Sequence, residues 1–356
     1  MKRLISIIVA LLAICGLLGY SSDRLQASSG STGSHVLNLY NWGDYIDPNL
    51  LTKFQKETGY HVNVETFDSN EAMYTKIKQG GTQYDLAIPS EYMVAKMKRA
   101  HLLKPLDQQK LTGWHNYDPR FLNQSFDRGN RYSMPYFWGT LGIIYNDKYV
   151  QASEVQHWQD LWSPKFRDKI MLIDSARDIM GMALITQGQS MNATDPATLS
   201  AAEKKLNELA PNVKAVVADE IKMYMIQNEA PLAVDWSGEA AEMLANNPHL
   251  HYIVPSEGSN LWFDNLVIPK TATHTKAIYA FLNFMSEPQN AAQNAKYIGY
   301  ATPNKAAKAL LPRSVRDDQQ FYPNQQTLQH LQVYQDLSPA KVQLYNDRYL
   351  EFKMHH

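Results

Sequence analysis

The stretch VLNLYNWGDYIDP, residues 36–48, decides the fold because it leads from an expected strand directly into an expected helix. Hydrophobic side chains alternate over residues 36–41, which is typical of a strand. Asp47 is placed to cap a helix that has Pro48 in its first turn and ends at Gly59. The stretch therefore predicts one strand-helix unit of an α/β fold.

Further units of the same kind follow along the chain. A strand is expected at 61–66, then a helix that ends at Gly80, and then a short buried strand at 84–88. Strands and helices that alternate in this way form parallel sheets with crossover helices. Ligands of such sheets bind beyond the carboxyl ends of the strands. We therefore expect one cleft to be lined by residues 42–45, 67–69 and 90–92.

A second α/β unit is expected to begin near Gly142. Its strands are predicted at 170–173, 213–217, 232–235 and 252–254. Helices are predicted around 176–187, 196–209, 219–228 and 238–246. The chain then continues through a strand at 265–269 and helices at 276–285 and 340–353. Two α/β units agree with the length of 356 residues, which suggests two globular domains.

The composition narrows the class of function. With 34 basic and 35 acidic residues the formal net charge is −1, which argues against a nucleic-acid partner. The chain lacks the Gly-x-Ser-x-Gly elbow, the Walker phosphate loop, the glycine-rich dinucleotide turn and the His-Glu-x-x-His motif. Its 11 histidines are scattered without ligand spacing, so no metal site and no cofactor is predicted. We therefore expect a protein that is not an enzyme.

Residues 1–20 have the pattern of an export signal, in which Lys2 and Arg3 precede an apolar run. The run is about as long as the shortest spanning helix. It also holds Cys15, the only cysteine, in a segment that partly matches a lipoprotein box. A cleaved leader, an uncleaved anchor and lipidation therefore all remain open. Residues 21–35 are expected to form a flexible tether, which places the body in the periplasm or at the outer face of the cytoplasmic membrane.

A tryptophan and a carboxylate occur within three residues of each other at three expected strand boundaries. The pairs are Trp42 with Asp44, Trp236 with Glu239, and Trp262 with Asp264. Ring faces attract ammonium groups through their quadrupole, and carboxylates neutralise the charge of such groups. The pattern predicts a pocket for an organic cation.

Several short motifs occur in the same regions and between them. They are Tyr40-Asn41-Trp42-Gly43-Asp44-Tyr45, Ser69-Asn70-Glu71-x-Met73-Tyr74, Tyr84-Asp85-Leu86, Pro89-Ser90-x-Tyr92, Phe137-Trp138-Gly139, Trp262-x-Asp264 and Ile298-Gly299-Tyr300-x-Thr302-Pro303-Asn304. In these motifs the chain resembles the polyamine-binding proteins of spermidine/putrescine ABC transporters. The resemblance covers residues 36–350 in collinear order, and its Ser-Asn-Glu and Trp-x-Asp motifs are highly specific.

This family has the type II periplasmic-binding fold. The resemblance therefore implies two α/β lobes, a ligand cleft between them, and two crossover hinges. Lobe 1 would comprise residues 36–140 and 265–310, and lobe 2 residues 141–264 and 311–356. By the same resemblance, a monomer would bind an extended polyamine in the cleft and deliver it to the membrane permease of an ABC importer.

The resemblance also implies roles for individual residues. Asp44 and Asp264 would neutralise amines, and Ser90 would supply a hydroxyl acceptor. The methylene groups of the ligand would lie between aromatic side chains, namely Trp42, Tyr45, Tyr92, Trp236, Trp262 and Tyr300.

Three positions depart from the pattern of the family. Spermidine-type members have Asp-Ala-Arg-Glu where this chain has Ser175-Ala176-Arg177-Asp178, so one carboxylate is lost and the other is shortened. Putrescine-type members have Trp-x-Gly-Asp where this chain has Trp236-Ser237-Gly238-Glu239, so Glu239 could supply the missing charge. Tyr334 stands where spermidine-type members have a glutamine. The sequence therefore leaves the preference between putrescine and spermidine open.

Two other functions remain as alternatives. A receptor of the same fold could bind an amino acid, iron or thiamine, and Arg177 would be the candidate partner for an amino acid's α-carboxylate. An enzyme with a two-domain α/β body is the second alternative, and the missing catalytic motifs argue against it.

Overall fold

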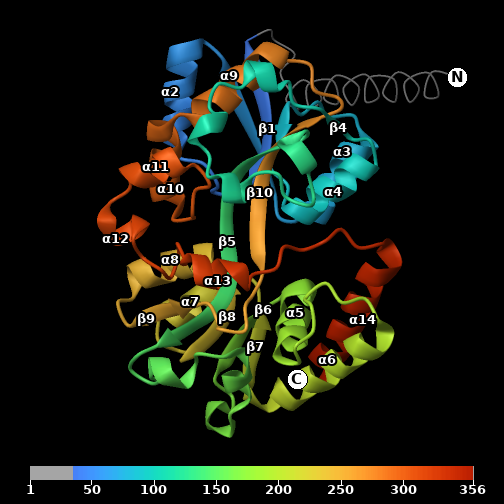
Figure 1. Cartoon of the computed structure of the whole chain (residues 1–356), viewed down its shortest axis with the longest axis vertical. Coiled ribbons are helices and arrows are strands. Elements are labelled where there is room, and N and C mark those ends of the chain that lie inside the picture. Colours follow the sequence, from blue (N-terminus) through green and yellow to red (C-terminus); the bar gives the residue numbers. More distant parts are fainter. Residues whose placement is uncertain (1–34, 356) are drawn as a thin grey trace, which may run out of the picture.

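The computed structural model describes residues 35–355 of the chain. The expected export segment 1–20 and the tether 21–35, apart from His35, lie outside the described residues. Within residues 35–355, no helix is both long and apolar enough to cross a membrane. Figure 1 shows two bodies, one above the other, that are joined by the long strands β5 (Ser133–Asn146) and β10 (Leu261–Pro269).

The strands form one mixed sheet that runs through both bodies. Its order is β2-β1-β3-β10-β5-β8-β6-β7, with β4 paired to β10 and β9 paired to β5. The parallel sets are β1, β2 and β3 in one body and β6, β7 and β8 in the other, whereas β5 and β10 run antiparallel to their neighbours. The other strands are β1 (Val36–Trp42), β2 (His61–Phe67), β3 (Leu86–Ala87), β4 (Leu103–Lys104), β6 (Ile170–Ile173), β7 (Val213–Val217), β8 (Leu232–Trp236) and β9 (Leu250–Ile253).

Helices cover the sheet in each body (Figure 1). In the first body these are α2 (Pro48–Thr58), α3 (Asn70–Gln79), α4 (Glu91–Arg99), α9 (Thr275–Ser286), α10 (Pro288–Ile298) and α11 (Lys305–Leu310). In the second body they are α5 (Ala176–Thr186), α6 (Pro196–Leu209), α7 (Ile221–Ile226), α8 (Ser237–Asn246) and α14 (Pro339–His355). The short helices α12 (Arg313–Arg316) and α13 (Gln325–Gln329) lie in the segment between α11 and α14.

Each body has its own hydrophobic core. The core of the first body includes Leu39, Phe54 and Phe281, and the second body has one buried cluster on each face of its part of the sheet. Along β5 the side chains pass from one core to the other between Trp138 and Leu141. Because the two cores are separate, the sheet strands that connect them are the natural place for the bodies to move relative to each other.

The lobe boundaries stay a prediction, but two segments pack differently from what they imply. Phe263 is buried in the core of the first body, although the predicted boundaries place residues 141–264 in lobe 2. Leu311 and Tyr322 lie in the core of the first body, although the predicted boundaries place residues 311–356 in lobe 2. The reason is aromatic packing, because the Tyr322 ring lies 6.0 Å from that of Trp138 and its hydroxyl accepts a hydrogen bond from the Thr302 amide at 3.1 Å. The tail first contacts the second body beside Tyr322, where the Phe321 ring stacks on Tyr252, and further along the chain α14 packs on α5 and α6.

Candidate functional site

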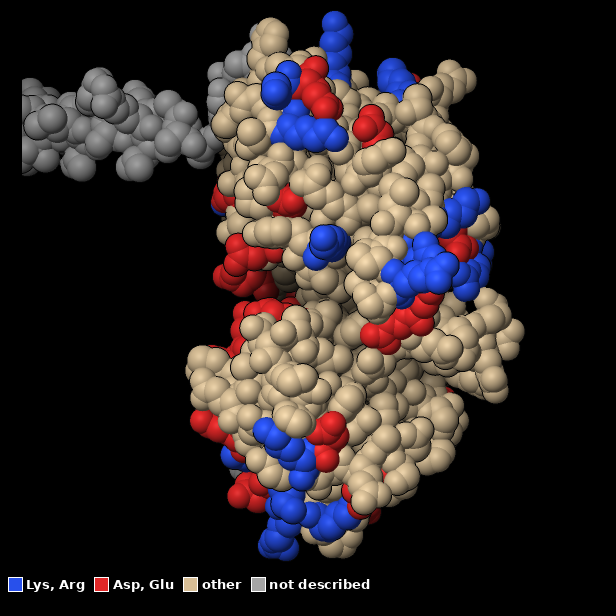
Figure 2. Space-filling view, turned by 90° about the vertical axis from the view of Figure 1, so that its left-hand side faces the viewer, with Lys and Arg blue, Asp and Glu red and all other residues tan. Residues whose placement is uncertain are grey.

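The two bodies leave a hollow between them. Figure 2 shows this hollow at mid-height of the molecule, with acidic side chains on both of the rims that face each other. The strands β5 and β10 pass from one body to the other, so residues near the middle of each strand lie at the boundary between the bodies.

Asp264 lies on β10 at this boundary. It is buried, and its carboxylate accepts hydrogen bonds from the hydroxyls of Tyr45 and Ser90, each at 2.7 Å. The register between β5 and β10 shifts between Asp264 and Asn265, and such a bulge re-aims a side chain. Burial raises the pKa of Asp264 to about 6, although the two hydroxyl donors lower it. Both donors are neutral, so no ion pair joins this carboxylate to a cation among residues 35–355.

Aromatic rings lie beside this carboxylate. Tyr45 packs edge-on against Tyr300 with the ring centroids 5.3 Å apart, and Trp262 packs against Tyr300 at 5.5 Å. Trp262 can lie close to β5 because residue 139 is glycine, and a Cβ atom at Gly139 would overlap the indole ring. An apolar wall beside a carboxylate favours a cation that also carries methylene groups.

A second buried carboxylate, Asp178, lies in the first turn of α5 in the second body. It accepts hydrogen bonds from the Ser175 hydroxyl at 2.6 Å, the Tyr334 hydroxyl at 2.8 Å and the Trp236 indole at 3.2 Å. Burial raises the pKa of Asp178, although these donors lower it. The structure thus brings four predicted residues together, and all three donors to the carboxylate are neutral.

Glu239, on α8, connects the two bodies. Its carboxylate accepts a hydrogen bond from the Tyr300 hydroxyl at 2.8 Å, and its second oxygen is paired with the ammonium of Lys222 at 2.8 Å. The ring of Tyr300 lies directly against Gly238, because a Cβ atom at that position would overlap the ring. This contact requires the two bodies to lie close together, as they do in this structure.

The remaining predicted residues lie outside these contacts. Trp42 donates its indole N–H to the Ile88 carbonyl at 2.8 Å and packs on Phe67, with ring centroids 4.5 Å apart. Tyr92 is half-buried and packs against the cores of both bodies. Asp44 is exposed in the turn after β1, and no hydrogen bond or ion pair joins its carboxylate to any residue from 35 to 355. The role of Asp44 as an amine partner stays a prediction.

Sequence reasoning did not single out Glu91, a buried carboxyl next to Ser90 at the start of α4. Glu91 accepts a hydrogen bond from the Phe263 amide at 2.9 Å, so the first turn of α4 contacts β10 both here and at Asp264. Burial raises the pKa of Glu91 to about 8, and the Asp264 carboxylate raises it as well, whereas backbone N–H donors and Arg177 lower it. The only signal in the sequence is that Glu91 follows a predicted site residue.

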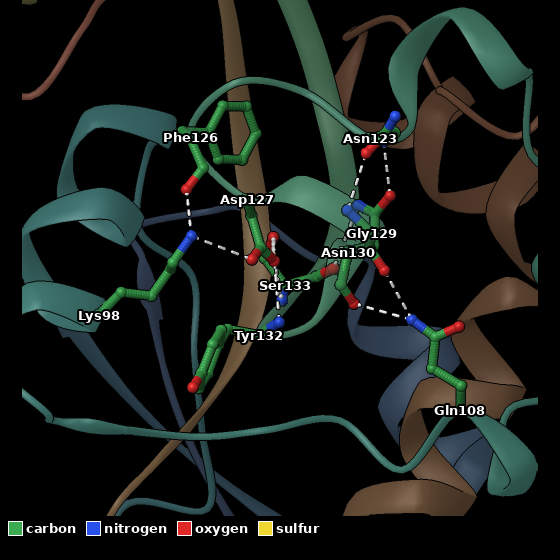
Figure 3. Close-up of polar contacts among 9 residues, drawn as sticks. All are labelled: Lys98, Gln108, Asn123, Phe126, Asp127, Gly129, Asn130, Tyr132 and Ser133. Atoms are coloured by element: carbon green, nitrogen blue, oxygen red, sulfur yellow. Dashed lines mark hydrogen bonds and ion pairs between the residues drawn. The ribbon is translucent and has the colours of Figure 1, made fainter.

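The opposite end of α4 is fixed to the start of β5. Lys98 donates to the Phe126 carbonyl at 2.6 Å and pairs with the Asp127 carboxylate at 3.2 Å (Figure 3). The second oxygen of Asp127 accepts hydrogen bonds from the backbone amides of Tyr132 and Ser133, each at 2.8 Å. This network holds in place the helix whose first turn contacts β10.

We expect the ligand-free protein to lose stability as the pH rises because of Glu91. A carboxyl with a folded-state pKa of about 8 and an ordinary value of 4.5 keeps its proton between these limits when folded and loses it on unfolding. Its contribution to stability is therefore present at low pH and is lost as the pH rises towards about 8. One such group contributes up to about 1.4 kcal/mol per pH unit.

Chemical denaturation of the wild type and of Glu91→Gln across this pH range would measure the effect. The glutamine keeps an acceptor for the Phe263 amide, so the variant should show a flatter pH dependence of the free energy of unfolding. Equal slopes in the two proteins would contradict the assignment.

The cleft offers little to a metal ion. Among residues 35–355, no group of three or more His, Cys, Asp or Glu side chains is arranged to hold one. The carboxylates of Asp264 and Asp178 accept hydrogen bonds from hydroxyl and indole groups instead. A hard metal ion needs several oxygen ligands at one point, so an organic cation suits these carboxylates better.

Comparisons with known proteins agree with this geometry. The model of the family described as bacterial extracellular solute-binding protein matches residues 49–323. The chain is 37% identical to the spermidine/putrescine-binding periplasmic protein of Salmonella typhimurium, over 96% of this chain and 97% of that protein. A solved spermidine/putrescine ABC transporter substrate-binding protein from Streptococcus pneumoniae is 55% identical with a TM-score of 0.85, covering 90% of this chain and 99% of that one. A solved putative spermidine/putrescine ABC transporter from Listeria monocytogenes is 53% identical with a TM-score of 0.84, covering 90% of this chain and 100% of that one.

Proposed function

The chain belongs to the bacterial extracellular solute-binding protein family, and from this premise we propose that it is the polyamine receptor of an ABC importer. It would bind spermidine or putrescine in the cleft between its two bodies and deliver the ligand to a membrane permease. Proteins of this class bind and release their ligand without changing it, so we expect no turnover. A monomer in the periplasm, or tethered to the outer face of the cytoplasmic membrane, fits this role.

One observation carries the proposal. Asp264 and Asp178 are buried carboxylates whose hydrogen-bond donors are all neutral, and they lie on two different bodies. A buried anion without a charge partner is costly, and a cationic ligand removes that cost. A ligand with two separated amines could pair with both carboxylates at once. The rings of Tyr45, Trp262 and Tyr300 would then contact the methylene groups between the amines.

The other predicted residues take supporting roles in this proposal. Ser90 and Ser175 orient the two carboxylates, each through a hydroxyl hydrogen bond. We propose further ligand contacts from the remaining side chains of the predicted set, namely Trp42, Asp44, Tyr92, Trp236, Glu239 and Tyr334.

An amino-acid ligand fits the cleft less well. Its α-carboxylate would need a cation, and Arg177 was the candidate in the sequence. The Arg177 guanidinium instead donates to Asn192 at 3.1 Å and to the Gln335 carbonyl at 3.5 Å, and it lies 4.5 Å from the centroid of the Tyr334 ring. With Arg177 engaged, the acidic cleft would repel a ligand carboxylate.

The test is stabilisation by ligand. A polyamine bound with micromolar affinity should, at millimolar concentration, raise the free energy of unfolding by roughly 4 kcal/mol. Thermal and chemical unfolding with putrescine, spermidine and spermine would measure this shift. Amino acids, thiamine and iron at the same concentration serve as controls and should give none. A protein that responds to a control ligand but to no polyamine would refute the proposal.

A further inference from the structure

Lys222 places a protein ammonium beside a carboxylate of the cleft. It lies on α7, and its Nζ atom is 2.8 Å from Glu239 and 2.9 Å from Glu242, both on α8. Partial burial lowers the pKa of Lys222, but the ion pairs of its ammonium with the two glutamates outweigh this effect and raise the pKa above its ordinary value. The side chain is therefore a permanent cation at neutral pH.

Glu239 belongs to the same group of side chains as Asp264. The Tyr300 hydroxyl donates to Glu239, and the Tyr300 ring packs against Tyr45, whose hydroxyl donates to Asp264. The charges of Glu239 and Asp264 both act on the Tyr300 hydroxyl, and after burial itself they help to hold its pKa well above the usual range. Glu239 thus faces the aromatic wall along which a ligand would lie.

Three carboxylates that accept a hydrogen bond from a tyrosine hydroxyl, those of Asp264, Asp178 and Glu239, differ in their charge partners. Asp264 and Asp178 accept hydrogen bonds from neutral groups, whereas Glu239 forms an ion pair with Lys222. Among residues 35–355, Glu239 is therefore the one of these three that forms an ion pair with a cationic side chain. Asp264 and Asp178 therefore remain without an ion pair for the amines of a ligand.

We propose that the ammonium of Lys222 occupies the place of a third ligand amine at Glu239, so that this cleft discriminates in favour of a diamine over a triamine. The proposal rests on the proposed polyamine function and names the residue that sets how many ligand charges the cleft accepts. A third ammonium would meet a carboxylate that is already paired and a like charge close to it. Specificity of this kind comes from a built-in repulsive element as well as from attraction.

The test is the ratio of spermidine affinity to putrescine affinity in Lys222→Met. Methionine keeps the length of the side chain and a similar helix propensity but removes the charge. Glu239 then becomes available to a third amine. We therefore expect the ratio to change by about tenfold or more in favour of spermidine, and a tenfold change corresponds to about 1.4 kcal/mol of binding free energy. Isothermal titration calorimetry with the two ligands measures the ratio, and melting without ligand checks that the variant is folded.

Two further variants of the chain make the test more specific. In the double variant Lys222→Met/Glu239→Gln the ratio should return towards that of the wild type, because the third carboxylate is gone. Lys165→Met is the matched control, since Lys165 forms an ion pair of the same kind with Glu154 at 2.7 Å on an exposed surface. Its ratio should equal that of the wild type.

Each outcome bears on the proposal in a different way. An unchanged ratio in Lys222→Met would overturn it, and so would an equal loss of affinity for both ligands, which would make Lys222 a group that only positions Glu239. A wild type that binds neither ligand would overturn the polyamine function itself, and the inference with it. A wild type that binds spermidine and putrescine, combined with a variant whose ratio does not move, would refute the inference alone.

Discussion

Replacing Asp264 with asparagine should weaken polyamine binding by about 30-fold to several thousand-fold, which corresponds to about 2–5 kcal/mol. An ammonium that enters the cleft loses its hydration and needs a charge partner in its place. Asparagine keeps the shape and one acceptor for the hydroxyls of Tyr45 and Ser90 but has no charge. The free energy of unfolding without ligand should not fall at neutral pH, because the lost carboxylate has no ion pair and its burial as an anion is costly.

Asp127→Asn is the matched control for this prediction. Asp127 is also buried, but it pairs with Lys98 and lies outside the cleft, so its replacement should lower stability and leave affinity nearly normal. Calorimetry and thermal melting of the two variants measure both quantities. If Asp264→Asn bound polyamines within about threefold of the wild type, a difference below about 1 kcal/mol, Asp264 would not be an amine partner.

Replacing Gly238 with alanine should weaken binding by about 1,000-fold. The added Cβ atom would overlap the ring of Tyr300, which belongs to the other body, so the bodies could not reach their observed contact. A micromolar ligand binds with about −8 kcal/mol, and one that keeps half of this free energy on a single body binds with a Kd of about 1 mM. Gly238 lies in the first turn of α8, where alanine should stabilise the helix by up to about 1 kcal/mol.

The two effects have opposite signs, which makes Gly238→Ala a specific test of closure. Melting without ligand should show an equal or more stable protein, while calorimetry should show the loss of affinity. Small-angle scattering should show a ligand-dependent contraction of the wild type and none of the variant. A variant that bound normally and contracted normally would show that Tyr300 can move aside at little cost.

The α/β units could be predicted from the sequence because their signals are local. The strands β6 and β7 and the helix α6 have the predicted bounds, and in the structure Asp195 caps α6 ahead of Pro196 in its first turn. Periodic hydrophobic side chains, caps and breakers all lie within the element that they define.

The long strand β5 could not be predicted in full for a physical reason. Its residues include Pro135, Gly139 and Gly142, which are typical of loops when only the sequence is considered. The structure explains the glycines, since a Cβ atom at Gly139 would overlap Trp262 and one at Gly142 would meet Tyr252. These contacts join distant parts of the chain and leave no local pattern.

The residues of the site likewise divide into those that the sequence could predict and those that it could not. Asp264 and Trp262 stand out because a tryptophan and a carboxylate lie two residues apart, and Tyr45 and Ser90 lie near strand ends. Glu91 could not be found because its partner Phe263 lies 172 positions away, and the charge of Lys222 matters only through α8. The part of the site that depends on three-dimensional neighbours was therefore invisible in the sequence.

The position of Asp264 on one of the two strands that join the bodies has a mechanical consequence. Rotation about paired strands displaces a point in proportion to its distance from them, so groups on the strands barely move while the outer rims travel furthest. A ligand amine would thus pair with Asp264 close to the rotation axis, where the strands move little. The same rotation would displace the outer rims of the two bodies by a much larger distance. A membrane partner that touches both rims could distinguish a loaded receptor from an empty one without contacting the ligand.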